Sequence, residues 1–328
     1  MEEATVLDAL EQALVQALQV DGRAPFERIG AVLGVSAQTV ARRYRRLRAE
    51  AGLRVVGVAD HERAGQAQWV VRVAAVPGAV EEIARALARR PETSWVKLTS
   101  AGTQIFAIVR SGLAEHPPVL SRLPHTRGIT SVSAHCLLHT YLGGPTAWHG
   151  RLRSLSDSQL ASLAPELPRT SAAPPTDTDL RLLDALRHDG RTPYAELAAA
   201  AGCSVATATR RLAELRSSRR LFFDVEVDPS GYGIATRALL WLTVRPADLD
   251  RIGTALAAHP ELAVVAAVTG PANLLAQALC TDPADLHRYL TRRLGAHPEI
   301  RHVEAEPLVR TVKAVGHLPT NPLAHLGR

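Results

Sequence analysis

The sequence predicts an α+β fold in which a winged-type helix-turn-helix and a ferredoxin-like βαββαβ regulatory domain form one unit that occurs twice. Asp-Gly-Arg-Ala-Pro-Phe at 21–26 returns as Asp-Gly-Arg-Thr-Pro-Tyr at 189–194, 168 residues later. The match continues without a gap through a glycine, a serine, a threonine and an arginine pair, which chance does not produce. The predicted domains are 1–53 and 177–222 (helix-turn-helix), 66–145 and 234–316 (ferredoxin-like), and 146–176 (linker).

Three short helices are predicted in each helix-turn-helix from the spacing of apolar residues. In the first copy Gly22 ends the first helix, and Pro25 starts the second at a position whose N–H is dispensable. Gly34 marks the turn because it tolerates the left-handed conformation, and Ser36 is a natural N-cap for the third helix. The buried stripe of the third helix is expected to be Val40, Tyr44 and Leu47 in the first copy and Ala208, Leu212 and Leu215 in the second.

Arginines cluster on the third helix of each copy, and this pattern is typical of a helix that reads DNA in the major groove. Arginine can contact guanine through two hydrogen bonds and glutamine can contact adenine in the same way, whereas later arginines contact phosphate. The alternative is a three-helix domain used for packing or protein contact, and the duplication of the pattern favours DNA. The predicted DNA-binding residues are Ser36, Gln38, Thr39, Arg42, Arg43 and Arg46, with Ser204, Thr207, Arg210 and Arg211 in the second copy.

The regions after the helix-turn-helix domains alternate between strand-like and helix-like runs in the order βαββαβ. Such a sheet has helices on one face and leaves the other face open, so we expect the two copies to pair within the chain. The linker is expected to be extended where prolines cluster, after a short helix capped by Ser156 or Asp157. Strands are predicted at 53–58, 69–76, 94–99, 105–109, 129–138, 221–227, 238–244, 262–268 and 274–279, helices at 80–87, 119–123, 249–257 and 286–294, and a final strand pair at 300–312.

Composition limits the class of protein. The chain has 328 residues, 46% hydrophobic and 21% charged, with a net charge of +6. Codon bias would explain the arginine excess alone, but not its clustering on two helices. No run of about 18 apolar residues is free of charges, the N-terminus is acidic, and the three cysteines lie far apart. We therefore expect a cytoplasmic protein with no membrane span, disulfide framework or zinc finger.

The chain resembles the Lrp/AsnC family of feast/famine transcriptional regulators, most clearly at Leu182 to Leu186, at the Asp189-Gly190-Arg191 turn and at Ala195 to Ala198. The resemblance implies double-stranded DNA as partner and a regulatory domain that oligomerises and binds an amino acid at subunit interfaces. Members of the family carry one unit per chain, so this chain resembles a fused dimer, and we expect a homo-oligomer of such chains.

The family's turn between the central strands commonly reads Gly-x-x-Asp. It reads Gly-Pro-Ala-Asn at 270–273 and Gly-Thr-Gln-Ile at 102–105 in this chain. The resemblance therefore places an effector at Thr269, Gly270 and Asn273, with Gly102 as the weaker counterpart. Glycine lets a ligand approach the backbone, and asparagine can donate and accept hydrogen bonds.

No motif for catalysis, a metal or a cofactor is recognised. His135 and His139 would share a strand face with Leu137, but no carboxylate is nearby, so no metal site is predicted. Asp177 and Asp179 are expected to cap the helix that follows them. The alternative function is that of a siroheme decarboxylase, an enzyme of haem biosynthesis that fused chains of this architecture resemble. That enzyme would need a histidine-rich and arginine-rich strand where 66–72 and 236–241 stand, and neither segment carries a histidine. We therefore do not expect an enzyme.

Overall fold

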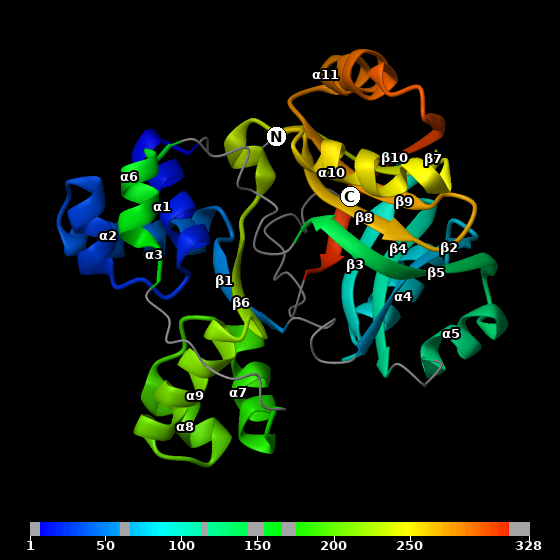
Figure 1. Cartoon of the computed structure of the whole chain (residues 1–328). Coiled ribbons are helices and arrows are strands. Elements are labelled where there is room, and N and C mark those ends of the chain that lie inside the picture. Colours follow the sequence, from blue (N-terminus) through cyan, green and yellow to red (C-terminus); the bar gives the residue numbers. More distant parts are fainter. Residues whose placement is uncertain (1–6, 60–65, 113–116, 144–153, 166–174, 315–328) are drawn as a thin grey trace.

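The structure is a computed structural model of the chain, and it describes residues 7–59, 66–112, 117–143, 154–165 and 175–314. Two small helical domains, joined by a two-stranded ribbon, lie beside a β-barrel (Figure 1). The first helical domain contains α1 (Ala9–Val20), α2 (Phe26–Leu33) and α3 (Ala37–Glu50), and the second contains α7 (Asp177–His188), α8 (Tyr194–Ala201) and α9 (Val205–Ser217).

The first helix of each helical domain begins with a capping box. Asp8 accepts a hydrogen bond from the Glu11 N–H, and the Glu11 side chain accepts one from the Asp8 N–H. In the second domain Thr176 is the cap and Asp179 is its partner. The expectation that Asp177 and Asp179 cap this helix is confirmed for Asp179, which belongs to the capping box, and is wrong for Asp177, because Thr176 is the N-cap residue.

The strand that leaves each helical domain pairs with the corresponding strand of the other copy. β1 (Arg54–Ala59) and β6 (Leu221–Glu226) are antiparallel, and Val56 lies opposite Asp224, its own counterpart in the repeat. The ribbon therefore has an approximate two-fold axis at its centre, called the pseudo-dyad below. The sequence predicts a strand leading out of each helical domain, and the two strands pair with each other because one strand alone would leave its backbone groups unpaired.

The repeated Asp-Gly-Arg turns exchange their arginines across the pseudo-dyad. The Arg23 guanidinium donates to the carbonyl oxygens of Gly190 and Thr192 at 2.7 and 2.9 Å. The Arg191 guanidinium donates to the carbonyl oxygens of Gly22 and Ala24 at 2.7 and 3.1 Å. Each arginine is thus bound by the turn of the opposite copy.

The aspartates and glycines of these turns complete the same interface. Asp21 forms an ion pair with Arg216 at 2.7 Å, and Asp189 forms the corresponding pair with Arg48 at 3.4 Å. A Cβ atom on Gly22 would lie 2.6 Å from the Cβ of Phe223, so only glycine fits against the ribbon. The two helical domains are therefore fixed to each other by paired backbone and by charged side chains from both copies.

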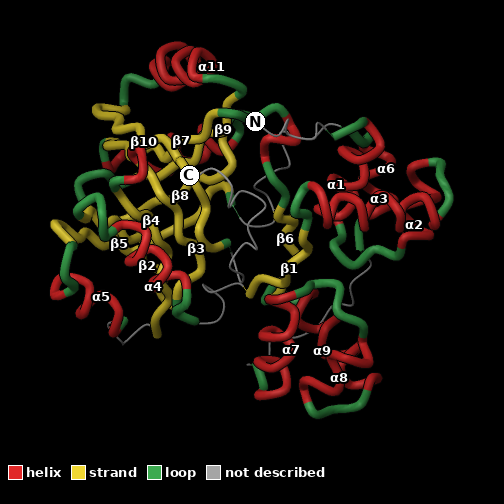
Figure 2. Tube along the Cα trace, turned by 180° about the vertical axis from the view of Figure 1, so that it is seen from behind, coloured by secondary structure: helices red, strands yellow, loops and turns green. Residues whose placement is uncertain are grey.

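The two βαββαβ modules form one closed eight-stranded barrel in the order β10-β3-β4-β2-β5-β8-β9-β7. Pairing of the halves within one chain was predicted and is confirmed, because their open sheet faces meet inside the barrel. Val70, Phe106 and Trp241 are among the residues buried there, and the helices lie outside (Figure 2).

The first module contains β2 (Gln66–Ala75), α4 (Val80–Ala88), β3 (Thr93–Thr99), β4 (Gln104–Gly112), α5 (Pro118–Arg122) and β5 (Ile129–Leu142). The second contains β7 (Thr236–Val244), α10 (Leu249–Ala257), β8 (Leu262–Val268), β9 (Leu274–Cys280), α11 (Pro283–Arg288) and β10 (Ile300–Lys313).

The last strand of each module is long because it belongs to both sheets. β5 pairs with β2 and then with β8, and β10 pairs with β7 and then with β3. The predicted final strand pair at 300–312 was wrong, since β10 is a single strand with register shifts where it passes between its partners. The predicted helix at 286–294 is an α-helix only up to Arg288 and then continues as a π turn.

The linker contains a helix that packs on the first helical domain. α6 (Asp157–Leu163) is capped by Ser156, as expected, and Leu163 is fully buried against that domain. The Arg28 guanidinium donates to the carbonyl oxygens of Ser162 and Ala164 at the end of α6. The helix lies where it was predicted, and the proline-rich stretch that was expected to be extended falls largely outside the described residues.

Asp224 gives the fold a pH dependence. Burial raises the pKa of its carboxyl to about 6, although the residue keeps some exposed surface. A carboxyl whose pKa is higher in the folded state than in the unfolded state costs stability as the pH rises between the two values. Asp224→Val, which copies Val56, is expected to stabilise the protein by about 1–3 kcal/mol at pH 8 and by much less at pH 4. Thermal melts at both pH values measure this, and an equal gain at both would contradict it.

Candidate nucleic-acid interface

Each helix-turn-helix has a glycine turn and a serine-capped third helix, as the sequence predicts. Gly34 and Gly202 are left-handed, with φ of 70° and 66°. The Ser36 and Ser204 side chains accept hydrogen bonds from the N–H groups three residues later, both at 3.1 Å. The hydroxyl groups of Thr39 and Thr207 lie 3.0 and 2.9 Å from the cap serines. These four predicted residues therefore shape the first turn of each third helix.

The free face of α3 carries Gln38, Arg42 and Arg45, all of which are exposed. They are spaced by four and three residues and so lie on one side of the helix, opposite the buried Val40 and Leu47. Arg45 was missed among the predicted site residues. The helical period could have identified Arg45, because a residue seven positions after Gln38 lies on the same side of the helix. This face offers an amide and two cations to the major groove.

Arg43 and Arg46, two of the predicted DNA-binding residues, form ion pairs within their own domain. Arg43 forms ion pairs with Asp8 at 2.7 Å and with Glu11 at 3.0 Å, and Arg46 pairs with Glu11 at 3.3 Å. Glu11 is only 1% exposed, so its charge is compensated almost entirely by these arginines. Arg46 also pairs with Glu50 on the surface. Arg43 therefore stabilises α1 against α3, and its charge is already balanced within the domain.

The second copy repeats this arrangement with an acidic residue in place of an arginine on the third helix. Arg211 pairs with the buried Asp179 and, at 2.6 Å, with Glu214. Burial alone would raise the pKa of Asp179, but hydrogen bonds from Arg211 and Thr176 hold it below its usual value. Arg210 is exposed but lies 2.6 Å from Glu214, which stands where the first copy has Arg46. The free face of α9 is therefore less basic than that of α3.

The predicted effector residues lie at the turn between β8 and β9. Asn273 accepts a hydrogen bond from the Val244 N–H at 2.9 Å and donates one to the Val244 carbonyl oxygen at 2.8 Å. The Thr269 hydroxyl accepts from the Cys136 N–H at 2.9 Å, and a Cβ atom on Gly270 would lie 2.3 Å from His135. These side chains therefore fix the turn against its neighbours. Gly102 has open space around it, with φ of 83°.

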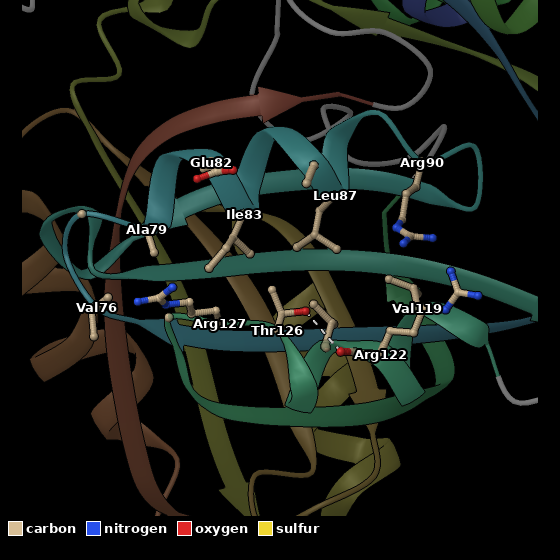
Figure 3. A pocket seen from close by; sticks show the side chains of 14 residues that line it. Val76, Ala79, Glu82, Ile83, Leu87, Arg90, Val119, Arg122, Thr126 and Arg127 are labelled. Atoms are coloured by element: carbon tan, nitrogen blue, oxygen red, sulfur yellow. Dashed lines mark hydrogen bonds between the residues drawn. The ribbon is translucent and has the colours of Figure 1, made fainter.

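A cavity that sequence reasoning missed lies between α4 and α5 (Figure 3). Its volume is about 540 Å³, and its apolar lining includes Ile83, Leu87 and Val119. Arg122 and Arg127 also line it. No periodic pattern points to it, because it arises from the packing of two helices outside the sheet.

The histidines flagged in the sequence do not form a cluster of metal ligands among the described residues. The ring Nδ1 of His135 lies 2.8 Å from the Thr269 carbonyl oxygen, and His139 lies against the ring of Tyr141. In the described part of the chain, no helix is both long and apolar enough to cross a bilayer.

Two helix-turn-helix domains, fixed across a pseudo-dyad and each exposing a basic helix, define a DNA-binding protein. The AsnC-type helix-turn-helix family model matches residues 7–48 and 176–216, and the model of the Lrp/AsnC ligand binding domain matches 237–317. Together the matched segments make up half of the chain. The chain belongs to the Lrp/AsnC family of transcriptional regulators, as a tandem duplication.

The curated relatives are matched over most of their own length by less than half of this chain. The HTH-type transcriptional regulator FL11 of Pyrococcus horikoshii is 23% identical over 147 residues, which cover 44% of this chain and 97% of that protein. The HTH-type transcriptional regulator AldR of Mycolicibacterium smegmatis is 25% identical over 130 residues, covering 38% and 75%. The crystal structure of the siroheme decarboxylase NirDL is similar in fold over 96% of this chain and 95% of its own, with a TM-score of 0.62 and 11% identity.

Arg42 and Arg43 are neighbours with different expected roles. Arg43→Ala leaves the buried Glu11 short of a partner and is expected to lower the free energy of unfolding by about 1–3 kcal/mol. Arg42→Ala is expected to leave stability unchanged and to lower DNA affinity. Chemical denaturation of both variants, with DNA binding measured at a temperature where both are folded, separates the roles. Equal stability of the two variants would contradict the assignment.

Proposed function

We propose that one chain reads an operator as a pseudo-dimer, with α3 and α9 in successive major grooves of the same DNA face. The observation that carries this is the fixed pairing of the two helix-turn-helix domains through β1, β6 and the exchanged Arg23 and Arg191. Paired readers in dimeric proteins contact half-sites about 34–36 Å apart. A single chain would therefore cover two half-sites without a second copy.

The two readers differ, so the preferred operator is an imperfect palindrome. α3 exposes Gln38 and Arg42, whereas α9 has Ala206 and an arginine paired with Glu214 at the corresponding positions. Glutamine and arginine can each recognise a base edge, while alanine contributes only apolar contact. The half-site under α3 should therefore be the more strongly specified one.

Substitution of the two arginines tests this asymmetry. Arg42→Ala is expected to cost about 1–3 kcal/mol of binding and to relax base preference at one position. Arg210→Ala should cost less, because Glu214 already neutralises Arg210. Glu214→Gln should raise affinity and steepen the salt dependence by about one unit, since it frees a cation for phosphate. Salt titrations with selected operators measure all three. Equal losses together with a symmetric selected site would show that the readers are equivalent.

The regulatory barrel is proposed to respond to an amino acid or another small effector, with chains assembling into homo-oligomers. The match to the Lrp/AsnC ligand binding domain over 237–317 supports this for the second module. The site proposed from the sequence is Thr269, Gly270 and Asn273, with Gly102 as its counterpart. The bonds of Asn273 to Val244 indicate that the side chain positions the turn.

Titration of the twenty amino acids against operator affinity tests the response. For an amino acid that changes operator affinity, Asn273→Ala is expected to weaken that change several-fold, because the turn loses both of its hydrogen bonds to Val244 on β7. Ala272→Ser, a change at the neighbouring position that keeps both anchors, serves as the control. An unchanged response in Asn273→Ala would place the effector elsewhere, and the cavity between α4 and α5 is then the next site to examine.

The similarity in fold to a siroheme decarboxylase keeps one enzymatic alternative open to test. Neither β2 nor β7, the strands at the start of the two modules, contains a histidine. Arg72 on β2 is bound to Glu304 and Glu306, which leaves it little capacity for a carboxylated substrate. Mixing the purified protein with siroheme and following its absorbance would reveal such an activity.

A further inference from the structure

A buried tyrosine fills the space beside α10 in the second module. Tyr289 is 2% exposed and belongs to the same buried cluster as Ile252 and Leu256 of α10. Its hydroxyl oxygen lies 3.2 Å from the Nδ1 atom of His259, and the rings of the two residues meet edge to face. The helix and the segment that follows α11 are thus packed together through an aromatic side chain.

The corresponding place in the first module is hollow. α4 and α10 are both nine residues long, and aligned end to end they pair Ile83 with Ile252 and Leu87 with Leu256. Ile83 and Leu87 line the cavity of about 540 Å³ between α4 and α5, and Figure 3 shows both side chains pointing into it. The cavity therefore lies on the face of α4 that corresponds to the tyrosine-covered face of α10.

The sequence of the first module explains why this space is empty. Short 3₁₀ turns, Leu123–His125 and Leu294–Ala296, precede the last strand of each module. When the modules are aligned on these turns, Pro118 stands where the second module has Tyr289. The first module therefore has the surrounding apolar residues without the aromatic ring that they enclose in the second.

One arginine of the cavity lacks the ion pair of its counterpart. The alignment on the 3₁₀ turns pairs Arg122, which lines the cavity, with Arg293. Arg293 forms an ion pair with Glu261 at 2.7 Å. The counterpart of Glu261 in the first module is Glu92, which pairs with Arg90 at 3.1 Å. Among the described residues no carboxylate pairs with Arg122, so its charge is available to a ligand.

The cavity carries an excess of one positive charge. Its charged lining consists of Arg90, Arg122, Arg127 and Glu82. Glu92 neutralises Arg90, and neither Arg127 nor Glu82 forms an ion pair with a described residue. Figure 3 shows Arg127 near the start of α4 and Arg90 just past its end, so cationic groups stand at both ends of an apolar centre. Two guanidinium groups against one carboxylate favour a ligand with a single negative charge.

We propose that the cavity between α4 and α5 binds a small monocarboxylate with an apolar body, of the arylalkanoate class. The body lies against Ile83, Leu87 and Val119, in the space that an aromatic ring fills in the second module, and its burial is favourable. The carboxylate accepts charge-assisted hydrogen bonds from the Arg122 guanidinium. Glu82 disfavours a second carboxylate on the ligand.

The size and the place of the cavity fit this role. Small-molecule sites commonly have volumes of about 300–1,000 Å³. A ligand between the two helices would fix α5 against α4 on the outside of the barrel. The cavity shares no lining residue with the turn between β8 and β9, where the amino-acid effector is proposed, so binding here needs neither that effector nor DNA.

Titration of the methyl-labelled full-length protein with 3-phenylpropanoate tests the proposal. The methyl resonances of Ile83 are expected to shift, while those of Ile252, its counterpart beside Tyr289, stay unchanged. 3-Phenylpropan-1-ol, which has the same body without the charge, should bind about 10-fold more weakly. No shift at Ile83, an equal shift at Ile252, or equal affinity for the acid and the alcohol would overturn the proposal.

Exposed charged residues provide the variants, with a matched control in the second module. Arg122→Gln is expected to weaken binding of 3-phenylpropanoate about 10-fold, whereas Arg293→Gln, the same change at its counterpart, should leave it unchanged. Glu82→Gln should strengthen binding several-fold and admit phenylsuccinate, which carries two carboxylates. Thermal melts check that each variant is folded. Equal affinities of the Arg122→Gln and Arg293→Gln proteins, or weaker binding by Glu82→Gln, would show that the anion is held elsewhere and would overturn the proposal.

Discussion

The exchange of Arg23 and Arg191 between the two Asp-Gly-Arg turns is the interaction on which the arrangement of the readers depends. Each guanidinium satisfies two carbonyl oxygens of the opposite copy, so neither helical domain has its full set of hydrogen bonds alone. Arg23 also lies over the Tyr194 ring, and Arg191 over the Phe26 ring. The separation of α3 and α9 is therefore set by contacts at the centre of the molecule, far from the bases they would contact.

Local patterns in the sequence predicted the helices and strands. They did not predict which segments pair when those segments lie far apart in the chain. The buried stripe of Val40, Tyr44 and Leu47, the left-handed Gly34 and the Ser36 cap depend on neighbours within one or two turns, and all were predictable. The pairing of β1 with β6 depends on two segments about 170 residues apart, so the sequence predicted the two strands but not that they pair with each other. The ion pair between Arg43 and Glu11 was not predicted for the same reason, because the two residues lie on different helices.

Duplication within one chain frees each half to change on its own. In an assembly of identical chains, a substitution on one reader appears on both, and the residues on the dyad face their own copies. Here Val56 faces Asp224, and Arg46 has Glu214 as its counterpart. The same freedom appears in the regulatory half, where the turn with Asn273 is anchored to β7 and the turn with Gly102 lacks an asparagine.

Closure of the barrel has a consequence for how chains can meet. An open sheet presents unpaired N–H and C=O groups along its outer strands, and these recruit strands from other molecules. Because β5 and β10 cross from one sheet to the other, each strand of the described barrel has two neighbouring strands, and the barrel has no outermost strand. Contacts between barrels are therefore expected to be made chiefly by side chains of the outer helices and turns, where a single charge can permit or prevent them. The barrel is protected in the same way from edge-to-edge aggregation.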